Sequence, residues 1–151
     1  MPTSPPARIN QRSLQPKCTS IRLDATHTPI VRVTLGREGN DGDFQAYLAD
    51  SDRVLQDGRP YALVYDALGG YGLSPVQRRL QTEWIQRNHT TLHQLCVAGA
   101  FAITSSAVRG ALTAILWVAP LPFEFRTFGT ALEAEIWVRE KLGQRGLTVR
   151  A

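Results

Sequence analysis

The chain has 151 residues, of which 43% are hydrophobic, so it can form one domain with a substantial core but not two. The formal net charge is +4, of which Arg8, Arg12 and Lys17 supply +3. The rest of the chain is nearly neutral, and its basic residues are dispersed among acidic ones. This distribution argues against nucleic-acid binding. With two cysteines and no apolar run of the roughly 18 to 20 residues that a spanning helix needs, we expect a cytoplasmic protein with neither a disulfide scaffold nor a membrane span.

The chain divides into a tail, a domain and a short end segment. Residues 1–18 are rich in proline and basic residues and have few large apolar side chains, so they cannot bury enough surface to offset the entropy lost on ordering. We expect them to form a disordered tail. Residues 19–146 are expected to form the folded domain, and residues 147–151 a flexible C-terminus.

Hydrophobic periodicity predicts alternating strands and helices in the domain. Residues 21–26 and 30–36 alternate apolar with polar side chains around His-Thr-Pro, which predicts an antiparallel pair of strands. Residues 41–58 place apolar side chains near helical spacing and end at Gly58, which suits a helix C-terminus. Residues 61–67 are mostly apolar, as in a strand that is covered on both faces.

A helix is predicted from Pro75 to about Leu95, because Ser74 is suited to cap it and proline is favoured at the first helical position. The order of elements, β-β-α-β-α-β-α-β-α, implies a single α/β domain with a mixed, largely parallel sheet of about five strands and about four helices. The expected apolar stripe of the 75–95 helix comprises Val76, Leu80, Trp84, Ile85, Leu92 and Leu95. The later elements are a strand at 96–103, an apolar helix that follows Ser105 and Ser106, a strand at 123–128 and a helix at 130–143.

The segment YALVYDALGGYGLSPVQRRL, residues 61–80, joins a strand to a helix through a glycine cluster. A P-loop needs two glycines that flank four residues and are followed by lysine, and this segment has neither the spacing nor the lysine. A dinucleotide-binding loop would need a glycine where Pro75 stands. The sequence therefore argues against both kinds of nucleotide site.

Two helix starts share a chemistry that could attract anions. Arg78 and Arg79 lie in the first turn of the 75–95 helix, where the helix dipole disfavours cations. Ser105, Ser106 and Arg109 repeat this pattern at the next helix, and parallel strands would bring both starts to one edge of the sheet. One hypothesis is that the two turns bind a small anion or a phosphopeptide. The simpler alternative is that the serines cap helices and the arginines are solvated.

The remaining candidate sites are weaker. His89 and His93 are four residues apart on a helix and could reach one metal ion, but no third ligand is evident. Asp66 is the best lone carboxylate for catalysis, although its alternative role is to accept hydrogen bonds from loop amides. No serine or cysteine has the partners of a nucleophile, so we expect no metal, no cofactor and no enzymatic activity. The tryptophans, Trp84, Trp117 and Trp137, fall in helical stripes that indicate a core or an interface.

Three stretches resemble the STAS-domain superfamily, specifically bacterial SpoIIAA-like proteins that are similar to anti-sigma-factor antagonists. YALVYDALGGYGLSP, residues 61–75, resembles the family's strand, aspartate, connecting loop and serine-bearing helix start. SSAVRGALTAILW, residues 105–117, resembles the helix before the closing strand. TFGTALEAEIWVREKL, residues 127–142, resembles that strand and the final helix.

The resemblance implies a non-enzymatic regulatory or scaffolding module that signals by contact with another protein, such as a regulator, a kinase or a scaffold. In phosphorylatable members the second helix begins with Asp-Ser-Ser-Gly, and Ser74 is the only position that could match. Gly72, Leu73 and Pro75 replace the flanking residues, so the implied phospho-switch is degenerate. The implied contact surface is the 69–79 loop and the helix that follows, with Asp66, Gly70, Gly72, Ser74, Arg78 and Arg79 as its switch or partner-binding residues.

The resemblance also implies an alternative, a carrier of a small molecule or lipid. Such a carrier needs an apolar cavity, and small side chains could either leave room for one or permit close packing. A homodimer is also compatible with the apolar helix faces of a small module. The small residues in question are Ala98, Gly99, Ala100, Ala102 and Gly110.

Overall fold

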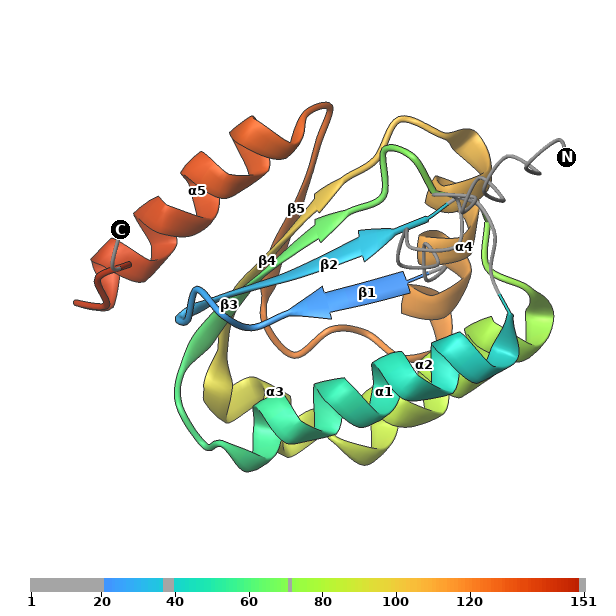
Figure 1. The fold of residues 1–151 in the computed structure, drawn as a ribbon, viewed down its shortest axis with the longest axis horizontal. Helices are drawn as coiled ribbons and strands as arrows, with labels where there is room; N and C mark the ends of the chain where they lie inside the picture. Colours follow the sequence, from blue (N-terminus) through green and yellow to red (C-terminus); the bar gives the residue numbers. More distant parts are fainter. Residues whose placement is uncertain (1–20, 37–39, 71, 150–151) are drawn as a thin grey trace, which may run out of the picture.

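The computed structural model describes residues 21–36, 40–70 and 72–149, and the predicted tail lies outside this range. Five strands form one sheet in the order β1-β2-β3-β4-β5 (Figure 1). β1 pairs antiparallel with β2, as predicted, and the other neighbours pair in parallel. The strands are β1 (Ile21–Asp24), β2 (Ile30–Leu35), β3 (Tyr61–Asp66), β4 (Cys96–Ala102) and β5 (Glu124–Phe128).

The α/β class and the mixed five-stranded sheet are confirmed, but the described residues form five helices rather than about four. The expected 75–95 helix is divided at Asn88, whose backbone (φ −106°, ψ 14°) leaves helical geometry. The Asn88 side-chain amide donates to the Trp84 carbonyl at 2.9 Å, a local bond of the kind that competes with helix continuation. The helices are α1 (Asp41–Gln56), α2 (Pro75–Arg87), α3 (His89–Leu95), α4 (Ser106–Val118) and α5 (Ala131–Gln144).

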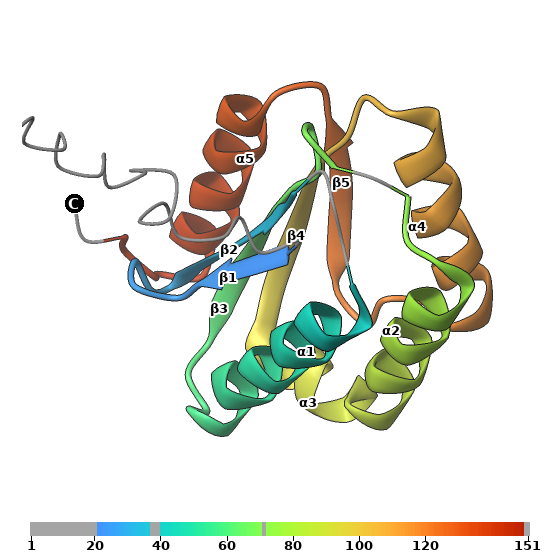
Figure 2. The same cartoon turned by 45° about the vertical axis from the view of Figure 1, so that its right-hand side comes forward.

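The sheet separates two unequal layers of helices (Figure 2), with α1 to α4 on one face and α5 on the other. The alternation of β2 explains this arrangement, because successive side chains of a strand point to opposite faces. Val31, Val33 and Leu35 join the larger core beneath α1 to α4. Ile30 joins the smaller core beneath α5. Each face therefore has an apolar surface of its own to bury.

The small residues of β4 serve close packing. Ala98, Ala100 and Ala102 are fully buried in the smaller core against α5, where Val138 and Leu142 are fully buried as well. On the opposite face, a Cβ at Gly99 would lie 2.7 Å from the Phe123 ring, so a larger residue could not be placed there without movement. The room that these residues leave is thus occupied by neighbouring side chains.

Most of the stripe expected for α2 is buried, since Trp84 and Ile85 are buried and Leu80 packs against the larger core, but Val76 does not belong to it. Val76 is 40% exposed, whereas Gln77 and Gln81 are only 2% and 9% exposed and lie beside the buried Trp84 and Ile85. Gln77 bonds to the helix N-cap and to α1, and these bonds turn it, rather than Val76, toward the interior. The first turn of the helix is therefore oriented by polar contacts and not by its most apolar residue.

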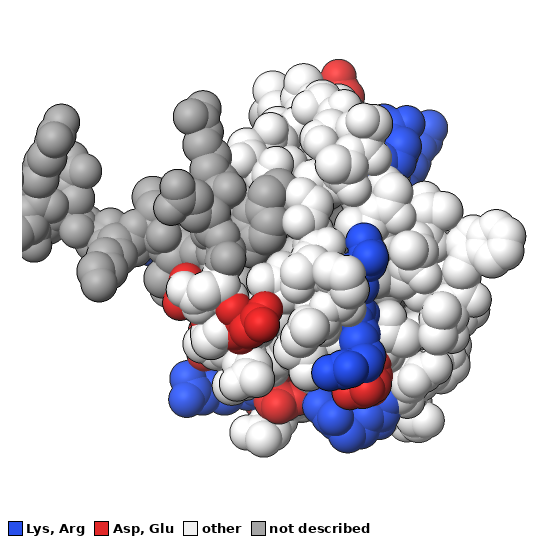
Figure 3. All heavy atoms as spheres, turned by 90° about the vertical axis from the view of Figure 1, so that its right-hand side faces the viewer, with Lys and Arg blue, Asp and Glu red and all other residues white. Residues whose placement is uncertain are grey.

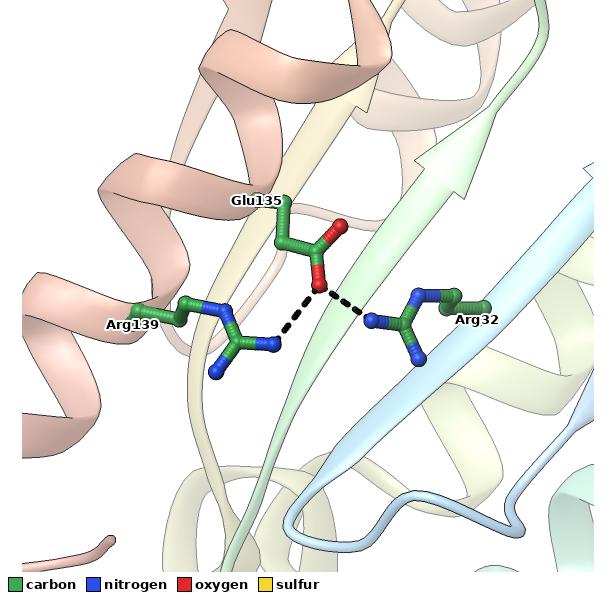
Figure 4. Close-up of polar contacts among 3 residues, drawn as sticks. All are labelled: Arg32, Glu135 and Arg139. Atoms are coloured by element: carbon green, nitrogen blue, oxygen red, sulfur yellow. Dashed lines mark hydrogen bonds and ion pairs between the residues drawn. The ribbon is translucent and has the colours of Figure 1, made fainter. Parts of the chain in front are cut away.

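An ion-pair cluster ties α5 to the sheet across the smaller core. Glu135 of α5 accepts hydrogen bonds from Arg32 of β2 and, at 3.0 Å, from Arg139 one turn further along α5 (Figure 4). Beyond α5, Leu147 and Val149 pack against the same core, within the segment that we expected to be flexible. None of the helices in the described ranges is both long enough and apolar enough to cross a bilayer.

Candidate functional site

The loop after β3 is held in place by Asp66. The backbone N–H of Leu68 donates to Asp66 Oδ1 at 3.1 Å, so this carboxylate accepts a hydrogen bond from a loop amide. The next residue, Ala67, donates its N–H to the Ala102 carbonyl at 2.9 Å and thereby joins the loop to β4. The sequence left Asp66 open between catalysis and this structural role, and the observed contact is the structural one.

The loop approaches β2 so closely that it needs glycine at position 70, whereas Gly72 lies at ordinary contact distance from α4. A Cβ at Gly70 would lie 2.8 Å from the Cβ of Leu35, at the end of β2. A Cβ at Gly72 would lie 3.4 Å from the Cβ of Ala107, in the first turn of α4. The loop is therefore packed between β2 and the start of α4, and Gly72 brings the two helix starts that the sequence singled out into proximity.

Ser74 caps α2 with a complete capping box. Its Oγ accepts from the Gln77 N–H at 3.1 Å, and Gln77 Oε1 accepts from the Ser74 N–H at 3.1 Å. The Gln77 amide also donates to Asp41 Oδ1 at 3.3 Å, in the first turn of α1. Gln77 was not among the predicted site residues, although the Ser-x-x-Gln spacing at Ser74 is a recognised cap signature.

The two arginines of α2 occupy different settings. Arg78 is half-buried and donates to the Leu73 carbonyl at 3.4 Å, which turns it back onto the loop. Arg79 is exposed and lies 3.9 Å from Glu83, at the limit of an ion pair, so this contact contributes little stability. The first turns of α2 and α4 contain no acidic residue. Both helix starts are therefore electropositive, from the helix dipole and from the arginines together.

The exposed face of α4 forms a shallow groove next to this loop. Ser105 caps α4 by accepting from the Val108 N–H at 3.4 Å. Ser106 and Arg109 line the groove, and Arg109 makes no ion pair with any described residue. Trp117, at the far end of the groove, is 85% exposed, whereas the other two tryptophans are buried. Of the two roles that the sequence gave to tryptophan, core and interface, the exposure of Trp117 fits only the second.

We define the edge surface as the 69–79 segment together with the groove on α4. In the described residues, no hydrogen bond or ion pair joins Arg78 or Arg79 to Ser106 or Arg109, so the two starts are neighbours without direct polar contact. Figure 3 shows the side of the molecule on which α4 and the beginnings of α1 and α2 lie. It is largely uncharged, with basic side chains in a column down its middle and acidic side chains beside the lower end of that column and to its left.

Two of the other candidate groups, His93 and Cys96, have structural partners. His93 Nδ1 lies 2.9 Å from the Pro122 carbonyl, which ties α3 to the segment before β5. Within the described ranges, no three histidine, cysteine or acidic side chains gather as a metal site would require. Cys96 is buried at the start of β4, where its thiol donates to the Ala98 carbonyl at 3.6 Å, and burial raises the pKa of the thiol to about 12 despite a hydrogen bond with Tyr61. Its thiol is therefore protonated at neutral pH.

Comparisons with known proteins do not assign the chain to a family. No model of a known protein family matches the chain, and no curated protein matches it either. The resemblance of residues 61–75 to the STAS superfamily thus stays a prediction from sequence.

Proposed function

We propose that the protein is a non-enzymatic regulatory or scaffolding module, similar to STAS domains, that binds another protein through the edge surface. The observation that carries this proposal is that Gly72 packs against Ala107 and so unites two electropositive helix starts on one surface. That surface combines exposed apolar side chains with cations, a combination that is common in protein interfaces. Val76 is 40% exposed beside Arg79, and Trp117 is 85% exposed at the end of the α4 groove.

The chemistry of the edge surface favours an acidic partner segment with apolar anchors. Arg79 and Arg109 extend from helix starts that have no acidic residue in their own first turns, which favours an incoming carboxylate or phosphate. Asp41 of α1 lies beside the α2 start, where it accepts a hydrogen bond from the Gln77 amide, so the start of α4 is the more favourable of the two for an anion. Exposed tryptophan and arginine are also the residue types that most often dominate binding energy. The kind of partner, whether a regulator, a kinase or a scaffold, follows from the STAS resemblance alone.

The degenerate phospho-switch of Ser74 belongs to the same proposal. Phosphate at a helix N-cap is favoured by the dipole and by free N–H groups, and Arg78 lies in the same turn. The phosphate would also disturb the bond from the Gln77 N–H to Ser74 Oγ, which links the switch to the buried side of α2. Intact-mass measurement of protein from its native cells tests this step, and unmodified mass under every growth condition excludes it.

Partner capture with matched charge reversals tests the proposed function. The full chain, immobilised, is exposed to native lysate, and the captured proteins are compared between wild type and variants. Val76→Glu, Arg79→Glu and Arg109→Glu are expected to lose one and the same partner, because each places a negative charge on the edge surface. Arg87→Glu reverses a charge at the other end of α2 and is expected to retain it. A partner that all four variants bind equally well would rule out the edge surface as its docking site.

A further inference from the structure

The larger core contains a partly open cavity of about 100 Å³. Its walls are side chains of β1 to β4 on one side and of α1, α2 and α4 on the other, and we call it the core cavity. None of the lining residues is charged, and most are aliphatic or aromatic. An engineered apolar cavity of about 150 Å³ in another protein stays dry and binds benzene, so a space of this order is large enough for a small organic molecule.

Most polar side chains around the core cavity have hydrogen-bond partners. Ser51 Oγ donates to the Tyr47 carbonyl at 2.9 Å, and the Tyr47 hydroxyl is hydrogen-bonded with Ser51 and Tyr65. Trp84 Nε1 donates to Asp52 Oδ1 at 2.8 Å. These groups are satisfied within the protein and do not require a ligand.

Gln81 is different. It lines the core cavity from the middle of the buried face of α2, is 9% exposed, and has no side-chain hydrogen bond to any described residue. Gln77, one turn earlier, is bonded at both its oxygen and its nitrogen. An unpaired buried amide destabilises a protein by about 1–3 kcal/mol, so an amide that no other described residue satisfies, at an apolar cavity, points to a partner outside the described residues, and a bound molecule would supply one.

We propose that the core cavity binds a small uncharged alcohol, aldehyde or ketone of about four to six carbons. Its hydrocarbon part would fill the apolar cavity, and its one hydroxyl or carbonyl group would hydrogen-bond to the Gln81 amide. A charged ligand is disfavoured because no lining residue would offset its lost hydration. A lipid is too large, since pockets for ligands of drug size already measure about 300–1,000 Å³. A lone water molecule needs about two to four polar partners, whereas Gln81 is the one amide that the cavity leaves unpaired.

This inference is independent of the proposed partner binding. The core cavity lies beneath α2 and shares only Leu73 with the edge surface, whose proposed contacts are made by residues such as Val76 and Arg79 on the outside of the same helix. A failure of one proposal therefore leaves the other standing, and the two are tested with different variants.

Two probes of equal size test the proposal on the full chain. Cyclopentanol and methylcyclopentane each have six non-hydrogen atoms, but only cyclopentanol can hydrogen-bond to Gln81. Binding is followed by chemical shifts of cavity-lining amides such as those of Val33 and Ile115. Cyclopentanol is expected to shift these signals saturably, whereas pentanoate, which is charged, is expected to leave them unchanged.

Three variants locate the site. Gln81→Leu removes the amide but keeps an apolar side chain, and it is expected to weaken cyclopentanol binding by about threefold to tenfold and to change methylcyclopentane binding by less than about twofold. Ala111→Leu fills the cavity from α4 and is expected to weaken binding of both probes by more than about tenfold. Gln56→Leu, at the exposed end of α1, is the matched control and is expected to bind both probes as wild type does.

Each contrary result overturns the proposal. Absence of saturable cyclopentanol shifts in folded wild-type protein means that the cavity takes no such ligand. Undiminished binding in Ala111→Leu places the ligand elsewhere. Equal cyclopentanol affinity in wild type and in Gln81→Leu removes the assigned role of the amide.

Discussion

At the residue scale, Gln77 and Gln81 form a matched pair on one buried face. Gln77 completes the cap of α2 and bonds Asp41, whereas the Gln81 amide has no bonding partner among the described residues. In the absence of ligand, Gln81→Leu is expected to raise the free energy of unfolding by about 1 kcal/mol or more, because it removes an unsatisfied group. Gln77→Leu is expected to lower it by about 1–2 kcal/mol. Urea unfolding of both variants measures the difference.

The exposed substitution Gln56→Leu is the control for this pair, because it adds the same apolar side chain without touching either core. Its free energy of unfolding is expected to lie within about 0.5 kcal/mol of wild type. If Gln81→Leu destabilised the protein as much as Gln77→Leu, the amide of Gln81 would have a partner in the native state.

Cys96 is expected to be inert in the folded protein. Burial raises the pKa of its thiol to about 12, so the thiolate fraction at pH 8 is on the order of 10⁻⁴, and reagents cannot reach the buried sulfur. A Cys18→Ser background leaves Cys96 as the one remaining thiol. Labelling by a thiol reagent should be at least about a hundredfold slower before unfolding in guanidinium than after it. Comparable rates in the two states would show that β4 opens readily.

At the element scale, the helix caps were the most readable signals. Ser74 was predicted to cap α2 and does so, and Thr130 caps α5 by accepting from the Glu133 N–H at 3.2 Å. The break at Asn88 was not predictable from periodicity, because apolar residues continue at helical spacing on both sides of it. The buried face of α2 was predicted correctly except at Val76, where hydrogen bonds from Gln77 outweigh the apolar character of valine in setting the orientation of the first turn.

The two caps at the carboxyl edge differ in strength. Ser74 takes part in a reciprocal capping box with bonds of 3.1 Å, whereas Ser105 accepts a single longer bond of 3.4 Å. Ser74→Ala is therefore expected to lower the free energy of unfolding by about 1–2 kcal/mol, and Ser105→Ala by about 0.5 kcal/mol. Chemical denaturation of the two variants gives the order. A larger loss for Ser105→Ala would mean that the α4 start, and not α2, stabilises this edge.

At the scale of the whole molecule, the sequence predicts the sheet because strand alternation and helix spacing are local. It predicts less of the edge surface, because the packing of Gly72 on Ala107 depends on how β3 and β4 are placed side by side. The exposure of Trp117 was equally hidden, since a helix stripe does not reveal which of its faces the rest of the chain covers. The core cavity forms only when the helices pack on the sheet, so it cannot be predicted from local sequence. The one local sign of it is the polar residue Gln81 on the buried face of α2.

The α5 layer is tied to the sheet through Glu135, which makes stability depend on pH. Burial raises the pKa of this carboxyl, but hydrogen bonds and charges from Arg139 and Arg32 outweigh burial, and the net pKa lies below its ordinary value (Figure 4). A folded-state pKa below the unfolded value of about 4.3 means that the cluster stabilises fully above that pH. Its contribution is lost as the pH falls from there through the folded-state pKa.

Glu135→Gln is expected to lower the free energy of unfolding by about 1 kcal/mol at pH 7, and the difference from wild type should shrink steadily below about pH 4.3. Glu140 is an exposed residue of the same helix, and its carboxylate makes no ion pair with the described residues. Glu140→Gln therefore serves as the control for net charge. Urea unfolding of the three proteins from pH 7 to pH 3 tests this. If the difference between wild type and Glu135→Gln stayed constant with pH, protonation of Glu135 would leave the attachment of α5 to β2 unchanged. If Glu140→Gln gave the same difference, the effect would come from net charge. Either result would mean that the ion-pair cluster does not stabilise the protein through the charge of Glu135.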